Sequence, residues 1–185
     1  MKYQFKKMVP LFLLTFLLFL VGCSQRKDVV TCPFTDITWE STLEEVQSAS
    51  GELLESYPSS YKGTTYVYPK EYDGMEGTIK YMFDEENRLK SMAWLYIPTS
   101  KNDLEKVYAS LVDRTTKWYG DSGFDSDLVT AKGEVWYLEG GNVLIGVMST
   151  GINEAIQYQY FHPEVSSEKP EKSSNNLKSV FEKIF

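Results

Sequence analysis

The sequence has little of what most enzymes use. Its 185 residues contain one histidine, His162, and two cysteines, Cys23 and Cys32. Histidine is the usual acid and base near neutral pH, so its scarcity argues against most acid–base catalysis. Zinc-ligand spacing, a phosphate-binding glycine loop and the Gly-x-Ser-x-Gly nucleophile motif are all missing. We therefore predict no catalytic residues, no metal ligands and no cofactor.

One short motif matches an enzyme but lacks its partners. The letters GDSG at 120–123 are those around the nucleophile of trypsin-like proteases. Such an enzyme needs a histidine base upstream of the serine, whereas His162 lies downstream, and Phe124 replaces the next glycine. We interpret the motif as the end of a helix and the start of a loop.

The same loop offers oxygen ligands for a cation. Asp121, Asp125 and Asp127 lie close together in the sequence, and calcium prefers several such oxygens. Their spacing is not that of an EF-hand, and no glutamate closes the loop. A solvated loop is the favoured interpretation, and a cation site is the alternative. The 26 acidic residues also leave open a hydrolase acid pair that no pattern identifies.

The chain begins with an apolar run that is short for a membrane span. Residues 8–22 number 15, fewer than the roughly 18 expected of a spanning helix. The run follows three lysines, at positions 2, 6 and 7, without an acidic residue, and it ends in small residues. This pattern is typical of a secretory signal peptide.

The end of that run carries a second signal. Leu20-Val21-Gly22-Cys23 resembles the lipobox of bacterial lipoproteins, in which the cysteine receives a diacylglyceryl group and the preceding peptide bond is cut. The resemblance implies a signal peptide at 1–22 and a lipid anchor on Cys23, on the extracytoplasmic side of a bacterial membrane. Two or more acyl chains anchor a protein stably. Ser24 implies outer-membrane sorting in a bacterium with two membranes. A plain signal peptide or an uncleaved anchor remains the alternative.

Removing the leader makes an acidic chain more acidic. The formal net charge of −7 becomes −10, because three lysines and no acids are lost. An acidic surface repels nucleic-acid phosphates and anionic headgroups, so we expect no nucleic-acid partner and a membrane contact through lipid alone. With Cys23 acylated, Cys32 has no partner within the chain and is buried, free or paired with another molecule. A nucleophilic role for it is disfavoured, since no histidine is near in sequence.

Periodicity predicts two helices and six strands. Ser41 and Glu44 form a capping box for a helix at 42–50, and an apolar stripe follows Ser100 and Asp103 up to Gly120. Alternation predicts strands at 64–68, 78–83, 89–97, 134–139, 143–149 and 154–161. We therefore predict an α+β fold of two α-β-β-β units, with the helices packed on one face of an antiparallel sheet.

The fold is bounded by polar segments. We expect a tether at 23–33, the α+β domain at 34–161 and a polar linker at 162–176. A short amphipathic helix at 177–185 ends the chain, with one apolar face made of Leu177, Val180, Phe181, Ile184 and Phe185. Alone it is too short to be stable in water, so it either docks on the domain or binds a partner.

Motifs in the first half resemble a known class. Phe-x-Asp-Ile-x-Trp at 34–39, before a Ser-x-x-Glu-Glu-Val helix and a meander, resembles the envelope lipoproteins with a β-lactamase-inhibitor-protein-like domain, of the SmpA/OmlA type. Glu40 departs from the glycine that is common there. The resemblance covers about 34–161. It implies helices on one sheet face and a protein bound by the other face or by a loop, and it transfers no functional residue.

The strand at 89–97 supplies the candidate binding face. Met92, Trp94 and Tyr96 share one side, and an aliphatic side opposes them. We expect the aliphatic side beneath the helices and the aromatic side exposed for a partner; burial of the aromatic side is the alternative. We therefore predict a non-catalytic, lipid-anchored protein-binding or assembly module with an envelope protein partner. A small-ligand or cation sensor is the alternative function, and a hydrolase is the third.

Overall fold

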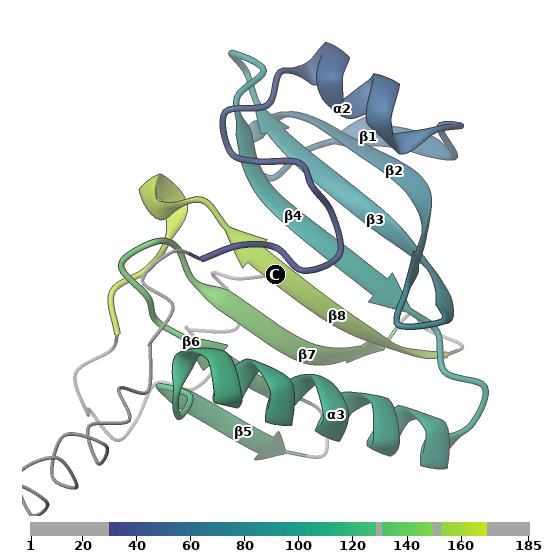
Figure 1. The fold of residues 1–185 in the computed structure, drawn as a ribbon, viewed down its shortest axis with the longest axis vertical. Coiled ribbons are helices and arrows are strands. Elements are labelled where there is room, and N and C mark those ends of the chain that lie inside the picture. The colour runs from purple at the N-terminus through teal and green to yellow at the C-terminus, as the bar shows by residue number, and fades with distance from the viewer. Residues whose placement is uncertain (1–29, 129–130, 150–152, 170–185) are drawn as a thin grey trace, which may run out of the picture.

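The computed structural model describes residues 30–128, 131–149 and 153–169, which form an α+β fold (Figure 1). The elements in chain order are α2 (Leu43–Ser50), β1 (Glu55–Pro58), β2 (Lys62–Tyr72), β3 (Met75–Asp84), β4 (Leu89–Tyr96), α3 (Lys101–Tyr119), β5 (Phe124–Leu128), β6 (Ala131–Trp136), β7 (Val143–Ser149), β8 (Glu154–Phe161) and the 3₁₀ turn η1 (Pro163–Val165). The strands form one eight-stranded sheet in the order β1-β2-β3-β4-β8-β7-β6-β5. Two antiparallel meanders therefore meet where β4 pairs with β8.

The number of strands differs from the prediction. Each described helix is followed by four strands rather than three, so the structure does not show α-β-β-β units. The additional strands, β1 and β5, lie at the two edges of the sheet and have four and five residues. Segments this short hardly display alternation, and the acidic residues of β5 favour the prediction of a loop. The α+β class and the antiparallel sheet are confirmed.

Both described helices begin at side-chain caps. Thr42 Oγ1 accepts a hydrogen bond from the Glu45 amide at 3.2 Å, and Glu45 Oε2 accepts one from the Thr42 amide at 2.7 Å. The capping box thus lies one residue beyond the predicted pair, because Ser41 Oγ instead accepts from the Thr38 amide. For α3, Ser100 is the cap and Gly120 the terminator, as predicted.

The helices lie on the same face of the sheet (Figure 1). Val46 of α2 and an apolar stripe of α3 (Leu104, Tyr108, Leu111) enter one core cluster with side chains from the sheet. In this core the Thr115 hydroxyl lies 2.8 Å from Tyr158 Oη, which lies 2.7 Å from Tyr160 Oη. Placement of the helices on one face agrees with the prediction.

The aromatic side of β4 faces the helices. In the register with β8, Met92 lies opposite Tyr160 and Trp94 opposite Tyr158. Met92 is 2% exposed and Trp94 is 0% exposed, while Tyr96 is partly buried and donates a 2.8 Å hydrogen bond to Asp103 of α3. The predicted orientation is therefore wrong. Large rings fill the space between helix and sheet and bury more apolar area than the aliphatic side would.

The folded region extends beyond the predicted bounds. Val30 belongs to the core cluster, so the end of the predicted tether is packed against the domain. After β8, residues 162–169 are fastened rather than free, because Asn142 donates hydrogen bonds to Ser166 Oγ and to the carbonyl oxygen of Ser167. The predicted leader with Cys23 and the predicted helix at 177–185 lie outside the described residues.

Within those residues, no helix combines the length and apolar character needed to cross a membrane.

Candidate functional site

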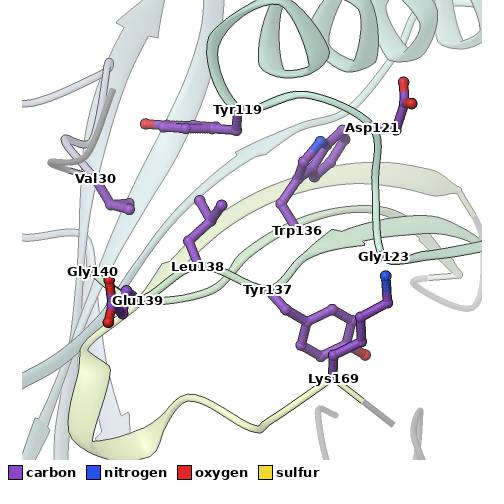
Figure 2. A pocket seen from close by; sticks show the side chains of 10 residues that line it. All are labelled: Val30, Tyr119, Asp121, Gly123, Trp136, Tyr137, Leu138, Glu139, Gly140 and Lys169. Atoms are coloured by element: carbon purple, nitrogen blue, oxygen red, sulfur yellow. The ribbon is translucent and has the colours of Figure 1, made fainter. Parts of the chain in front are cut away.

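A pocket lies where both ends of the described chain converge beside the C-terminal end of α3 (Figure 2). Its volume is about 460 Å³. Three aromatic side chains from α3, β6 and the residue after β6 form part of its wall, namely Tyr119, Trp136 and Tyr137. Trp136 is held in place by a 2.8 Å hydrogen bond from its Nε1 to the carbonyl oxygen of Gly120. The end of α3 and the end of β6 therefore form part of the pocket wall.

The polar groups of this pocket are of two kinds. Asp121, Glu139 and Lys169 are exposed at its rim. Tyr119 is 6% exposed, and its hydroxyl oxygen has no hydrogen-bond partner of acceptable geometry. Burial raises the pKa of Tyr119, and the nearby Tyr160 and Thr31 backbone lower this pKa in part. The arrangement suits binding of a small amphipathic molecule better than proton transfer at neutral pH.

The protease-like letters do not form a catalytic arrangement. Gly120 ends α3, and Asp121, Ser122 and Gly123 lead into β5. His162 instead caps η1, because its Nδ1 accepts a hydrogen bond from the Glu164 amide at 3.1 Å. Burial is the main cause that lowers the pKa of His162. The imidazole is thus committed to holding the chain after β8.

The three aspartates considered as cation ligands do not share one loop. Asp121 precedes β5, while Asp125 and Asp127 lie on that strand. The prediction of a single acidic loop is therefore wrong, since β5 pairs with β6 through this stretch. Across residues 30–124, 132–148 and 153–169, where side chains are described, no group of three or more histidine, cysteine or acidic residues is placed to hold a metal ion.

Cys32 lies against the aromatic core. Burial raises the pKa of its thiol well above the ordinary value, and hydrogen bonding with the backbone of Phe34 lowers this pKa in part. A nucleophilic cysteine needs the opposite shift, toward the thiolate at neutral pH. The environment of Cys32 therefore favours a structural thiol.

Exposed large apolar side chains gather instead at one edge of the sheet. Leu53, Leu54 and Tyr57 are 45%, 54% and 37% exposed. They lie on or just before β1, which ends the strand order and has no described strand on its outer side. Sequence reasoning missed this edge, although two adjacent leucines outside any periodic pattern are a signal of it.

The sheet face opposite the helices carries mostly small and polar side chains. We name it the open face. It includes Ser91, Ala93, Leu144, Gln157 and Gln159, which the strand register places on the side away from Trp94. Gln157 donates a hydrogen bond to Gln159, and Gln159 Nε2 donates one to Ser91 Oγ at 2.6 Å. Ser91 donates in turn to the Tyr160 carbonyl oxygen at 2.9 Å. These three hydrogen bonds fix the amide side chains of Gln157 and Gln159 across β4 and β8.

Comparisons with protein-family models, with curated proteins and with solved structures found no match to the chain.

Proposed function

We propose that the protein is a non-catalytic binding module, anchored by lipid on the extracytoplasmic side of a bacterial membrane. The anchor is proposed from the leader: the basic start, the apolar run at 8–22 and the lipobox-like residues that end in Cys23. Several acyl chains on one cysteine supply enough buried apolar area for stable attachment. The acidic body, at −10 without the leader, then stays away from anionic headgroups.

Edge strand β1 is the surface proposed to bind a protein partner. The single observation that carries this proposal is the gathering of Leu53, Leu54 and Tyr57, all exposed, at an edge whose backbone groups no described strand pairs. An extended segment of a partner can add to such an edge through backbone hydrogen bonds, while apolar side chains supply specificity. Pro58, which lacks an amide hydrogen, limits uncontrolled pairing at the end of the strand.

The anchor is tested by metabolic labelling with radioactive palmitate. Wild-type protein is expected to incorporate the label and to sediment with membranes, whereas Cys23→Ala is expected to do neither. Cys32→Ala serves as the matched control, because it removes the other thiol and should retain both properties. Equal labelling of the wild type and Cys23→Ala would contradict the proposed lipid anchor on Cys23.

The binding edge is tested by comparing two equally exposed positions. Leu54 is 54% exposed on the β1 edge, and Ile97 is 56% exposed at the end of β4, away from that edge. Leu54→Arg is expected to abolish co-purification of a partner from crosslinked native membranes, and Ile97→Arg is expected to retain it. Equal retention by both variants would contradict binding at β1.

Small-ligand sensing is a second candidate function, favoured by the pocket beside α3. Its wall presents the side chains of Tyr119, Trp136 and Tyr137 to a small amphipathic ligand. A screen of small amphipathic compounds by thermal shift tests this function, with Tyr119→Phe as the matched variant. A bound compound whose stabilising effect is lost in Tyr119→Phe supports the pocket, and a screen without any shift argues against it.

A further inference from the structure

We propose that the partner segment that adds to β1 is basic: an extended stretch in which lysine or arginine alternates with apolar residues. The identity of this segment rests on the proposed function, because β1 is itself the proposed binding edge. Three features of the edge carry the inference: its few outward backbone groups, its exposed apolar side chains, and the acidic surface around it.

The backbone of β1 offers a partner only a short run of hydrogen bonds. The Ser59 amide donates a 2.9 Å hydrogen bond to the carbonyl oxygen of Gly63. Because hydrogen-bonded and non-hydrogen-bonded pairs alternate in an antiparallel ladder, the register places Tyr57 in the same class as Ser59. The amide and carbonyl groups of Ser56 then point away from β2, whereas Pro58 has no amide hydrogen to donate. A partner strand must therefore gain much of its affinity from side chains.

The side chains at this edge favour apolar residues in the partner. Leu53 and Leu54 are 45% and 54% exposed, and Tyr57 is 37% exposed. Lys80, a cation of β3, has its Nζ 5.5 Å from the centre of the Tyr57 ring, so this cation is engaged within the sheet. Apolar residues at alternate positions of a partner strand would share one side and could cover the two leucines.

The surface around the edge carries charge of one sign. Helix α2 lies beside β1 (Figure 1), and Glu52 and Glu55 flank the two exposed leucines. Within the described part of the chain, no lysine, arginine or histidine forms an ion pair with an acidic residue of the segment 31–61. This segment contains no basic residue and six exposed acidic ones, namely Asp36, Glu40, Glu44, Glu45, Glu52 and Glu55.

Charge complementarity selects the occupant. A basic strand places opposite charge beside these carboxylates, whereas a second copy of the chain would bring two acidic segments together, and like charges across an interface repel. The same repulsion disfavours nucleic acid. A strand that combines basic and apolar residues therefore fits both the charge and the leucines of this edge.

Peptides of defined composition test the chemistry of the partner. The probe is a short, fluorescently labelled peptide of alternating lysine and valine, titrated into the full-length protein in non-ionic detergent. Matched peptides carry serine or glutamate in place of lysine. Fluorescence anisotropy is expected to show the lysine peptide bound about tenfold more tightly than the serine peptide, and the glutamate peptide bound most weakly. Added salt is expected to remove most of this difference.

Charge-neutralising variants locate the effect. Glu52→Gln/Glu55→Gln is expected to weaken binding of the lysine peptide about tenfold and to leave the serine peptide unchanged. Glu105→Gln/Glu154→Gln removes the same charge at exposed positions on α3 and at the start of β8, and is expected to retain full affinity.

Leu54→Ser separates failure of this inference from failure of the proposed function. Lysine and serine peptides that bind equally, and that are both weakened by Leu54→Ser, would overturn the basic segment while leaving β1 as the binding edge. A lysine peptide that does not bind, or that binds Leu54→Ser as tightly as the wild type, would overturn the inference. A dimer that dissociates in Leu54→Ser would also overturn it, because a second copy would then occupy the edge.

Discussion

Trp94 occupies the centre of the molecule and connects its two halves. Its ring stacks on Tyr96 with centroids 5.6 Å apart and meets the edge of Tyr72 at 5.4 Å. Its Nε1 donates a 3.1 Å hydrogen bond to the Lys70 carbonyl oxygen on β2. The residue thus ties β4 to the β2–β3 end of the sheet and to the core beneath α3, so its role is structural.

Truncation of this ring tests that role. Trp94→Ala is expected to lower the free energy of unfolding by about 3–5 kcal/mol, because it leaves a large cavity and an unpaired carbonyl oxygen. Glu105→Ala, at an exposed position on α3, is the control and is expected to change the free energy of unfolding by about 0.5 kcal/mol or less. Urea denaturation of both variants measures the difference. A Trp94→Ala variant as stable as the wild type would contradict burial of the aromatic side of β4.

The thiol of Cys32 offers a second test at this scale. Because burial raises its pKa, the thiolate fraction at pH 8 is small in the folded protein. Alkylation by iodoacetamide is expected to be about tenfold slower or more than in urea, since one pKa unit changes the thiolate fraction tenfold. Mass spectrometry over time measures both rates. Equal rates would show a reactive thiol and reopen the question of its role.

Residue-level prediction failed where two sides of a strand were both apolar. Alternation along β4 separated Met92, Trp94 and Tyr96 from the opposite side, as the register confirms. It could not say which side faces the helices, because Ala93 and Leu95 are also apolar. The choice depends on the volume available between helix and sheet, which only the assembled fold defines.

At the scale of elements, the turn between β3 and β4 is held by one carboxylate. Asp84 Oδ1 accepts hydrogen bonds from the amides of Glu86 and Arg88 at 3.0 and 2.9 Å, and Oδ2 accepts one from Arg88 Nε at 2.8 Å. Lys90 lies 3.4 Å from Asp84 and also pairs with Glu164 after β8. Asp84 therefore stabilises the hairpin and, through Lys90, its contact with the chain end.

Because of this arrangement, the free energy of unfolding depends on pH in the acidic range. Burial alone would raise the pKa of Asp84, but the hydrogen bonds from Arg88 and Glu86 lower it to about 2. The folded pKa lies below the unfolded value of about 3.9, so the stabilisation is complete above about pH 5 and is lost progressively as pH falls through about 2. Asp84→Asn is expected to unfold at lower urea concentration near neutrality and to show a shallower decline across this window. Parallel slopes for the two proteins would contradict this role.

Elements with strong local signals were predicted well, and weakly marked ones were not. The stripe and caps of α3, and the Gly-Gly-Asn turn before β7, carry their own conformational information. Edge strands β1 and β5 owe their conformation to pairing with β2 and β6. The capping box of α2 was displaced by one residue, because Ser41 and Glu44 have the same spacing as Thr42 and Glu45.

At the scale of the whole molecule, two meanders form one sheet whose two faces carry different kinds of side chain. One face supports α2 and α3 over an aromatic core. The opposite face carries the side chains of Gln157 and Gln159. The exposed Leu53, Leu54 and Tyr57 lie at the β1 edge, where we propose that a partner binds. That the chain has no catalytic residues stays a prediction from its single histidine and missing motifs. The position of the proposed binding edge follows from strand order, which no local pattern encodes.

The most direct test of the account is site-specific photo-crosslinking in living cells. A photoreactive amino acid at Leu54 is expected to capture a protein partner when the chain is anchored, and the same probe at Ile97, which is equally exposed, is expected to capture none. Loss of the Leu54 product in a Cys23→Ala background would further connect binding with anchoring. Equal products from both positions, or none from Leu54, would contradict a partner-binding edge at β1.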